Sequence, residues 1–129
     1  MGEPANRYEN FSALLNTAVS CGVGTLLGLN STPKAVLATI TSGTFVQARG
    51  MALTSGTAGD RITLWRQGRV NGYVGLTAGS NVYNAGNGQI TQTAPSTPGQ
   101  LVQVVGFAIS SSEIVLHIED ARVVALDSV

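Results

Sequence analysis

The sequence predicts an all-β protein, a small barrel or sandwich built from two related halves of about 56 residues with an N-terminal arm. Three observations carry this prediction. The 129 residues include 16 Gly, 13 Thr and 14 Val, which favour pleated strands and tight turns. Before residue 100, Lys, Glu and Asp occur only as Lys34, Glu3, Glu9 and Asp60, a composition that disfavours helices. A ten-residue segment also occurs twice.

Two segments, 61–66 and 114–118, alternate apolar and polar residues with a period of two. Successive side chains of a strand point to opposite faces, so this period predicts two half-buried strands. The apolar face is formed by Ile62 and Leu64 in the first segment and by Ile114, Leu116 and Ile118 in the second.

A β-hairpin is predicted between segments 82–84 and 89–91. The connection, residues 85–88, reads Ala-Gly-Asn-Gly. Its Asn-Gly pair supplies the positive φ angles that a primed hairpin turn requires.

An internal repeat organises the chain. Segment 46–55 aligns without a gap on segment 102–111, with identical or similar residues at eight of ten places. Two copies are too few for a solenoid, and they fit one barrel or sandwich instead. We therefore expect an arm at residues 1–20 and one β domain at 21–129, with its copies at about 22–70 and 78–129.

One face of each repeated segment is made of small residues, including Gly50 in the first copy and Gly106 in the second. A glycine inside a strand often marks the close approach of another backbone. We expect the two repeated strands to meet near the narrow interior of a small barrel.

Residues 1–20 admit two interpretations. The apolar residues follow a helical stripe, with Asn10 as a candidate N-cap. A helix this short is marginal unless its apolar side is covered, so an extended arm against a neighbour is the alternative. The stripe consists of Phe11, Leu14, Leu15, Ala18 and Val19.

Composition excludes several function classes. The formal net charge is +0, so no field attracts a nucleic-acid backbone, and no apolar run is long enough to predict a membrane-spanning helix. Cys21 and His117 are the single cysteine and the single histidine. They rule out an internal disulfide, multi-cysteine metal cages and His-pair zinc sites. We expect no cofactor and no metal.

Catalytic residues are not apparent. His117 and Glu119 share one strand face by alternation, but an enzyme would also need a nucleophile beside them. Because His117 aligns with Trp65 of the other copy, a surface or interface position is the better interpretation. Cys21 lies between two apolar stretches and is interpreted as a small hydrophobe. The sequence therefore predicts a protein that is not an enzyme.

Trp65, Arg66 and Arg69 form the most prominent candidate contact patch. An outward tryptophan is costly unless something covers it. We interpret the patch as a protein interface, and a tryptophan covered by its own loop is the ordinary alternative.

The order of the glycine-punctuated segments resembles that of the small β-rich decoration, or cement, proteins on the capsids of tailed bacteriophages. The resemblance covers roughly residues 40–118 and does not extend to residues 1–20. The segments that carry it are Gly-Asp-Arg-Ile-Thr-Leu at 59–64, Gly68, Gly-Leu-Thr-Ala-Gly-Ser-Asn-Val-Tyr at 75–83, Gly-Gln-Ile-Thr at 88–91, Ala94-Pro95 and Gly-Phe-Ala-Ile-Ser at 106–110.

This resemblance implies a structural virion protein on the outer surface of the head, made in the host cytoplasm and commonly trimeric. Its partner would be the major capsid protein, whose neighbouring subunits it would bridge and so stabilise. The candidate contact residues are Arg7, Tyr8 and Phe11 in the arm and Trp65, Arg66 and Arg69 on the β domain.

A second function class stays open. A carbohydrate- or receptor-binding module of a phage head fibre or tail appendage would use aromatic side chains as stacking platforms. The candidates for that role are Trp65, Tyr73 and Tyr83.

Overall fold

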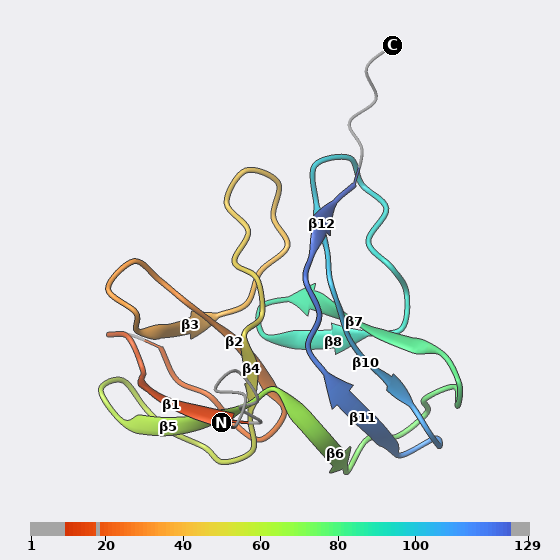
Figure 1. Ribbon diagram of the computed structural model, residues 1–129, viewed down its shortest axis with the longest axis horizontal. Helices are drawn as coiled ribbons and strands as arrows, with labels where there is room; N and C mark the ends of the chain where they lie inside the picture. Colours follow the sequence, from red (N-terminus) through yellow and green to blue (C-terminus); the bar gives the residue numbers. More distant parts are fainter. Residues whose placement is uncertain (1–9, 18, 125–129) are drawn as a thin grey trace, which may run out of the picture.

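The computed structural model describes residues 10–17 and 19–124 of the chain, and within them the protein is all-β (Figure 1). Two antiparallel sheets of five strands lie side by side, and a two-stranded ribbon projects beyond them. The predicted fold class is therefore confirmed.

The first sheet is drawn at the left of Figure 1 and the second at the right. In the first, the order is β1-β5-β4-β2-β3, with strands Asn10–Leu14 (β1), Thr25–Leu29 (β2), Ala35–Leu37 (β3), Gly50–Ala52 (β4) and Arg61–Trp65 (β5). In the second, the order is β6-β11-β10-β7-β8, with strands Gln67–Asn71 (β6), Asn81–Gly86 (β7), Gln89–Thr91 (β8), Val104–Ala108 (β10) and Glu113–His117 (β11). The ribbon pairs β9 (Leu101–Val102) with β12 (Arg122–Val123).

The two sheets have the same topology. Taken in chain order within each sheet, the strands lie in the spatial order first, fifth, fourth, second, third. The repeated segments provide the fourth strand in both sheets, β4 and β10. The sheets extend over residues 10–65 and 67–117, so the two halves join at Arg66.

The beginning of the described chain is a strand. β1 pairs antiparallel with β5 over its whole length, so the helical interpretation of the N-terminal segment is wrong for residues 10–14. The inward side chains follow a period of two, because Ala13 and Leu15 are both buried. The alternative interpretation, an extended arm against a neighbour, fits these residues, and the neighbour is β5 of the same chain.

The first sheet curls until its two edge strands meet. Leu15 forms a parallel bridge with Ala35, and the amide of Asn16 donates to the carbonyl oxygen of Ala35 at 3.0 Å. The curled sheet encloses its own apolar cluster. Its buried members are Ala13, Leu15, Leu27, Ala35, Ala52, Ile62 and Leu64.

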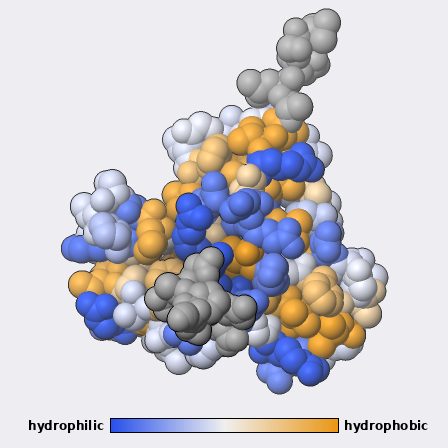
Figure 2. Space-filling model, viewed as in Figure 1, coloured by the Kyte–Doolittle hydropathy of each residue, from blue (hydrophilic) through white to orange (hydrophobic). Residues whose placement is uncertain are grey.

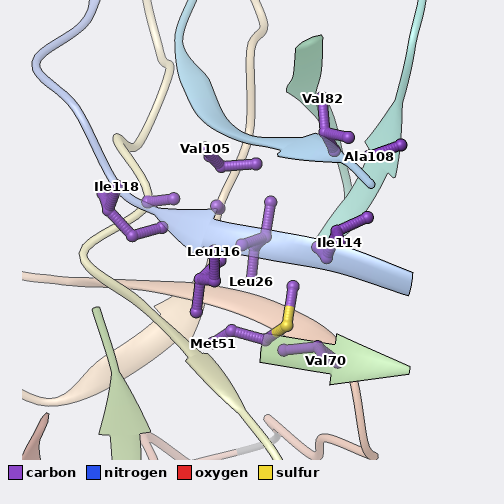
Figure 3. Close-up of a cluster of buried hydrophobic side chains, with 11 residues drawn as sticks. Leu26, Met51, Val70, Val82, Val105, Ala108, Ile114, Leu116 and Ile118 are labelled. Atoms are coloured by element: carbon purple, nitrogen blue, oxygen red, sulfur yellow. The ribbon is translucent and has the colours of Figure 1, made fainter. Parts of the chain in front are cut away.

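A second apolar cluster lies between the sheets (Figure 3). Leu26 and Met51 come from the first sheet and face the side chains of β6, β7, β10 and β11. The buried members are Leu26, Ala38, Ala48, Met51, Val70, Val82, Val105, Ala108, Ile114, Leu116 and Ile118. The outer face of the first sheet thus packs into the inner face of the second.

A buried side chain, Gln103, joins the two repeated segments by hydrogen bonds. Its Oε1 accepts from the amide of Ala48 at 2.7 Å, and its Nε2 donates to the carbonyl oxygens of Ala48 at 2.8 Å and Glu119 at 2.9 Å. The glycines have a different role from the expected one. A Cβ at Gly50 would lie 2.7 Å from Cβ of Leu64 on β5, and a Cβ at Gly106 would overlap the carbonyl of Val115 on β11. Each glycine therefore admits the next strand of its own sheet.

The predicted local features are confirmed. Ile62, Leu64, Ile114 and Leu116 are buried on β5 and β11. β7 and β8 form the predicted hairpin, and positive φ angles of 53° at Asn87 and 75° at Gly88 identify its primed turn.

Candidate contact surface

The arm residues contribute little to a described surface. Arg7 and Tyr8 lie outside the described residues. Phe11 is paired with Leu64 and packs against the cluster inside the first sheet. Its ring therefore stabilises the curled sheet and does not project away from the body.

Trp65 and Arg69 line one hollow. Trp65 ends β5 and packs, partly buried, against the cluster between the sheets. It lines a hollow of about 220 Å³ at the junction of the halves. Arg66 is exposed between β5 and β6. The hollow is lined by Leu53, Trp65, Gln67, Gly68, Arg69, Val70 and Leu116.

Arg69 is held by a two-point ion pair with Glu113 on the neighbouring strand. Nε of Arg69 donates to Oε2 of Glu113 at 3.0 Å, and Nη2 donates to Oε1 at 3.3 Å. The Arg69 side chain is 68% exposed, so solvent weakens the pair and its contribution to stability is small. The pair fixes the orientation of the guanidinium group on the surface.

An apolar surface at one end of the second sheet was missed by the sequence analysis. Phe107 is 41% exposed, Ile109 is 38% exposed, and Val74 is 90% exposed in the loop after β6. Figure 2 shows hydrophobic residues gathered at the lower right, over the hairpin of β10 and β11. The available signal was the alternation of Phe107 and Ile109 with Ala108, which places the large side chains opposite the buried face.

His117 and Glu119 do share a face, as alternation predicts. Nδ1 of His117 lies 3.7 Å from Oε2 of Glu119, and both side chains are more than half exposed. The described residues contain no group of three or more His, Cys, Asp or Glu side chains placed to hold a metal ion.

Cys21 packs against the cluster inside the first sheet. Its thiol donates to the carbonyl oxygen of Thr54 at 3.7 Å. Burial raises the pKa of the Cys21 thiol, which leaves less of the reactive thiolate at neutral pH. This environment agrees with the interpretation of Cys21 as a small hydrophobe.

The three candidate stacking residues do not form one platform. Trp65 lines the hollow at the junction, and Tyr73 lines a separate hollow of about 520 Å³ beside Cys21 and Gly88. Tyr83 is partly buried on β7. Burial raises the pKa of Tyr73, whose hydroxyl lies 3.8 Å from Sδ of Met51. Tyr73 therefore belongs to the packing between the sheets.

The sequence matches no protein-family model and no characterised protein. Among the residues with described positions, no helix is long and apolar enough to cross a membrane.

Proposed function

We propose that this protein is a structural component of a tailed-bacteriophage virion. It binds the outside of the head, bridges neighbouring subunits of the major capsid protein and has no enzymatic activity. Several copies associate, with a trimer as the favoured assembly. The order of segments across residues 40–118, which resembles that of capsid decoration proteins, supports this assignment.

The observation that carries the proposal is the exposure of Phe107 and Ile109 on the outer face of the second sheet, with Val74 also exposed in the loop after β6. Large apolar side chains exposed together on one sheet face are typical of protein contact sites. The loops beside the body are rich in Ser and Thr, which supply hydrogen bonds at the rim of such a contact.

The mechanism is the burial of surface. A protein that binds the assembled shell and not its free subunits stabilises the shell by mass action. Copies that associate with one another bind with avidity, since each bound copy holds the next near its site.

Cosedimentation with purified heads that lack the protein tests this function. Wild-type protein should sediment with the heads and raise their resistance to heat. The double variant Phe107→Ser/Ile109→Ser should bind at least tenfold more weakly. Val23→Ser, which removes a 69%-exposed valine elsewhere, is the control and should bind as wild type does. Wild-type protein that stays in the supernatant at every concentration would refute the function.

A further inference from the structure

Among the described residues, β6 is an edge strand of the second sheet. It pairs with β11 on one side, and no strand of residues 10–17 or 19–124 lies on its other side. In the first half, the corresponding strand β1 meets β3 at the bridge between Leu15 and Ala35. The two halves share a topology, and the second half keeps the edge that the first half closes.

Within the part of the chain that the structure describes, the backbone of β6 has hydrogen-bonding groups that face away from β11. The amide of Ile118 donates to the carbonyl oxygen of Arg66 at 3.0 Å, and the β6–β11 register continues from this pair without a shift. Hydrogen-bonded and non-hydrogen-bonded pairs alternate along an antiparallel ladder. The amides of Gly68 and Val70 therefore face β11, and those of Gln67 and Arg69 face the open side.

The hollow beside Trp65 adjoins the same strand. Four successive residues of β6, Gln67–Val70, line it, although their side chains alternate between the two faces of the sheet. Leu53, Trp65 and Leu116 form its apolar wall. At about 220 Å³ it is smaller than the pockets that typically hold small-molecule ligands. Its size and lining suit a single bulky apolar side chain.

The charge around the edge favours a carboxylate. Arg66 is exposed at the start of β6, and Arg69 is 68% exposed at its centre. Arg69 is already paired with Glu113 on β11. Arg66 is therefore the basic side chain beside this edge to which the described residues give no ion pair.

We propose that the open edge of β6 accepts an extended segment of the partner polypeptide as an added strand. One bulky apolar side chain of that segment enters the Trp65 hollow, and a neighbouring carboxylate lies near Arg66. In strand addition, backbone hydrogen bonds supply affinity and a pocket beside the edge supplies specificity. This inference rests on the proposed function, in which the segment belongs to a major capsid subunit.

Proline at an open-side position tests the inference. Arg69→Pro removes an amide that faces the open side and keeps the ladder with β11. Its matched control, Arg69→Ala, loses the same ion pair with Glu113 and retains the amide. Gln67→Pro and Gln67→Ala form a second pair, for use if Arg69→Pro fails to fold. Thermal unfolding checks that each variant is folded.

In cosedimentation with heads, each folded proline variant should bind at least tenfold more weakly than its alanine control. Equal binding within each pair would overturn strand addition at β6 and would leave the proposed function standing. If the wild type itself does not bind heads, the proposed function fails, and the edge is tested separately with a peptide.

The separate probe is a blocked octapeptide with a central Leu-Glu pair, flanked on each side by three residues of alternating Thr and Val. In NMR titrations it should shift the amide signals of Gln67 and Arg69 and the indole signal of Trp65. Arg69→Pro should weaken this binding at least tenfold relative to Arg69→Ala. Absence of shifts at saturating peptide, or shifts confined to other strands, would refute the acceptor edge.

Discussion

The two sheets share a strand order, and they differ in how much of each is covered. The first sheet has an apolar cluster on both faces: one cluster lies inside its curl and the other faces the second sheet. The second sheet buries one face, and the other carries Phe107 and Ile109 at 41% and 38% exposure. At the position aligned with Phe107 in the first half, Met51 is 0% exposed.

This difference shows how a duplicated sheet produces one buried interface and one free surface. The outer face of the first copy is covered by the second copy, so nothing within the described chain remains to cover the outer face of the second. Among the described residues, the first sheet is therefore covered on both faces, and the second sheet keeps one exposed face.

Gly106→Ala should have the largest effect, because the added Cβ would overlap the backbone carbonyl of Val115. β10 and β11 must then separate, at a cost of about 3 kcal/mol or more. Gly50→Ala should also destabilise the protein, but by less than Gly106→Ala does. The atom nearest to its added Cβ is Cβ of Leu64, at 2.7 Å. Urea unfolding of both variants measures the difference. Equal stability of Gly106→Ala and wild type would contradict the strand packing.

Gln103→Met should cost about 3 kcal/mol, since it leaves the backbone groups of Ala48 and Glu119 without their buried partner. The aligned residue Gln47 is partly exposed, so Gln47→Met is the matched control and should change stability by less than about 0.5 kcal/mol. The free energies of unfolding of the two variants test whether Gln103 contributes more to stability than Gln47 does. Similar losses at both positions would contradict the central role of Gln103.

Met51→Ala should cost about 3 kcal/mol, because Met51 is fully buried between the sheets. Phe107→Ala removes a larger side chain but should cost less, about 1 kcal/mol, because Phe107 is 41% exposed. Chemical denaturation compares the two. A larger loss for Phe107→Ala would show that the outer face of the second sheet is buried in solution.

A smaller effect is expected at alkaline pH. Burial raises the pKa of Tyr73 above its ordinary value near 10, so the folded state holds the proton more tightly than the unfolded state does. The stability that Tyr73 contributes is present below about pH 10 and is lost as the pH rises through the pKa of Tyr73 in the folded protein. Tyr73→Phe should therefore flatten the alkaline fall in unfolding free energy. An unchanged slope would contradict the burial of the hydroxyl.

The sequence predicted the features that depend on local pattern. The alternation around Ile62 and Ile114 located β5 and β11, and the Asn87-Gly88 pair located the hairpin turn. β1 was ambiguous because its apolar residues fit a helical stripe as well as a strand, and only pairing with β5 decides between them. β6 contains a single buried residue, Val70, so no alternation marked it.

The candidate site was predicted in part. The proximity of Trp65 and Arg69 follows from their spacing in the chain. Phe11 packs inside the first sheet, and Gln103 hydrogen-bonds Ala48 and Glu119. Both contacts depend on which segment lies opposite each residue. The similarity of the two copies does not determine how one copy packs on the other. The exposure of Phe107 depends on which face of the second sheet the first sheet covers, and the alternation of residues alone does not determine this.

Amide hydrogen exchange of the free protein along β6 distinguishes an open edge in the second half from a covered one. We expect slow exchange at Gly68 and Val70, whose amides face β11, and much faster exchange at Gln67 and Arg69. Equal protection of all four amides would contradict this expectation, since a further strand would then already cover the edge.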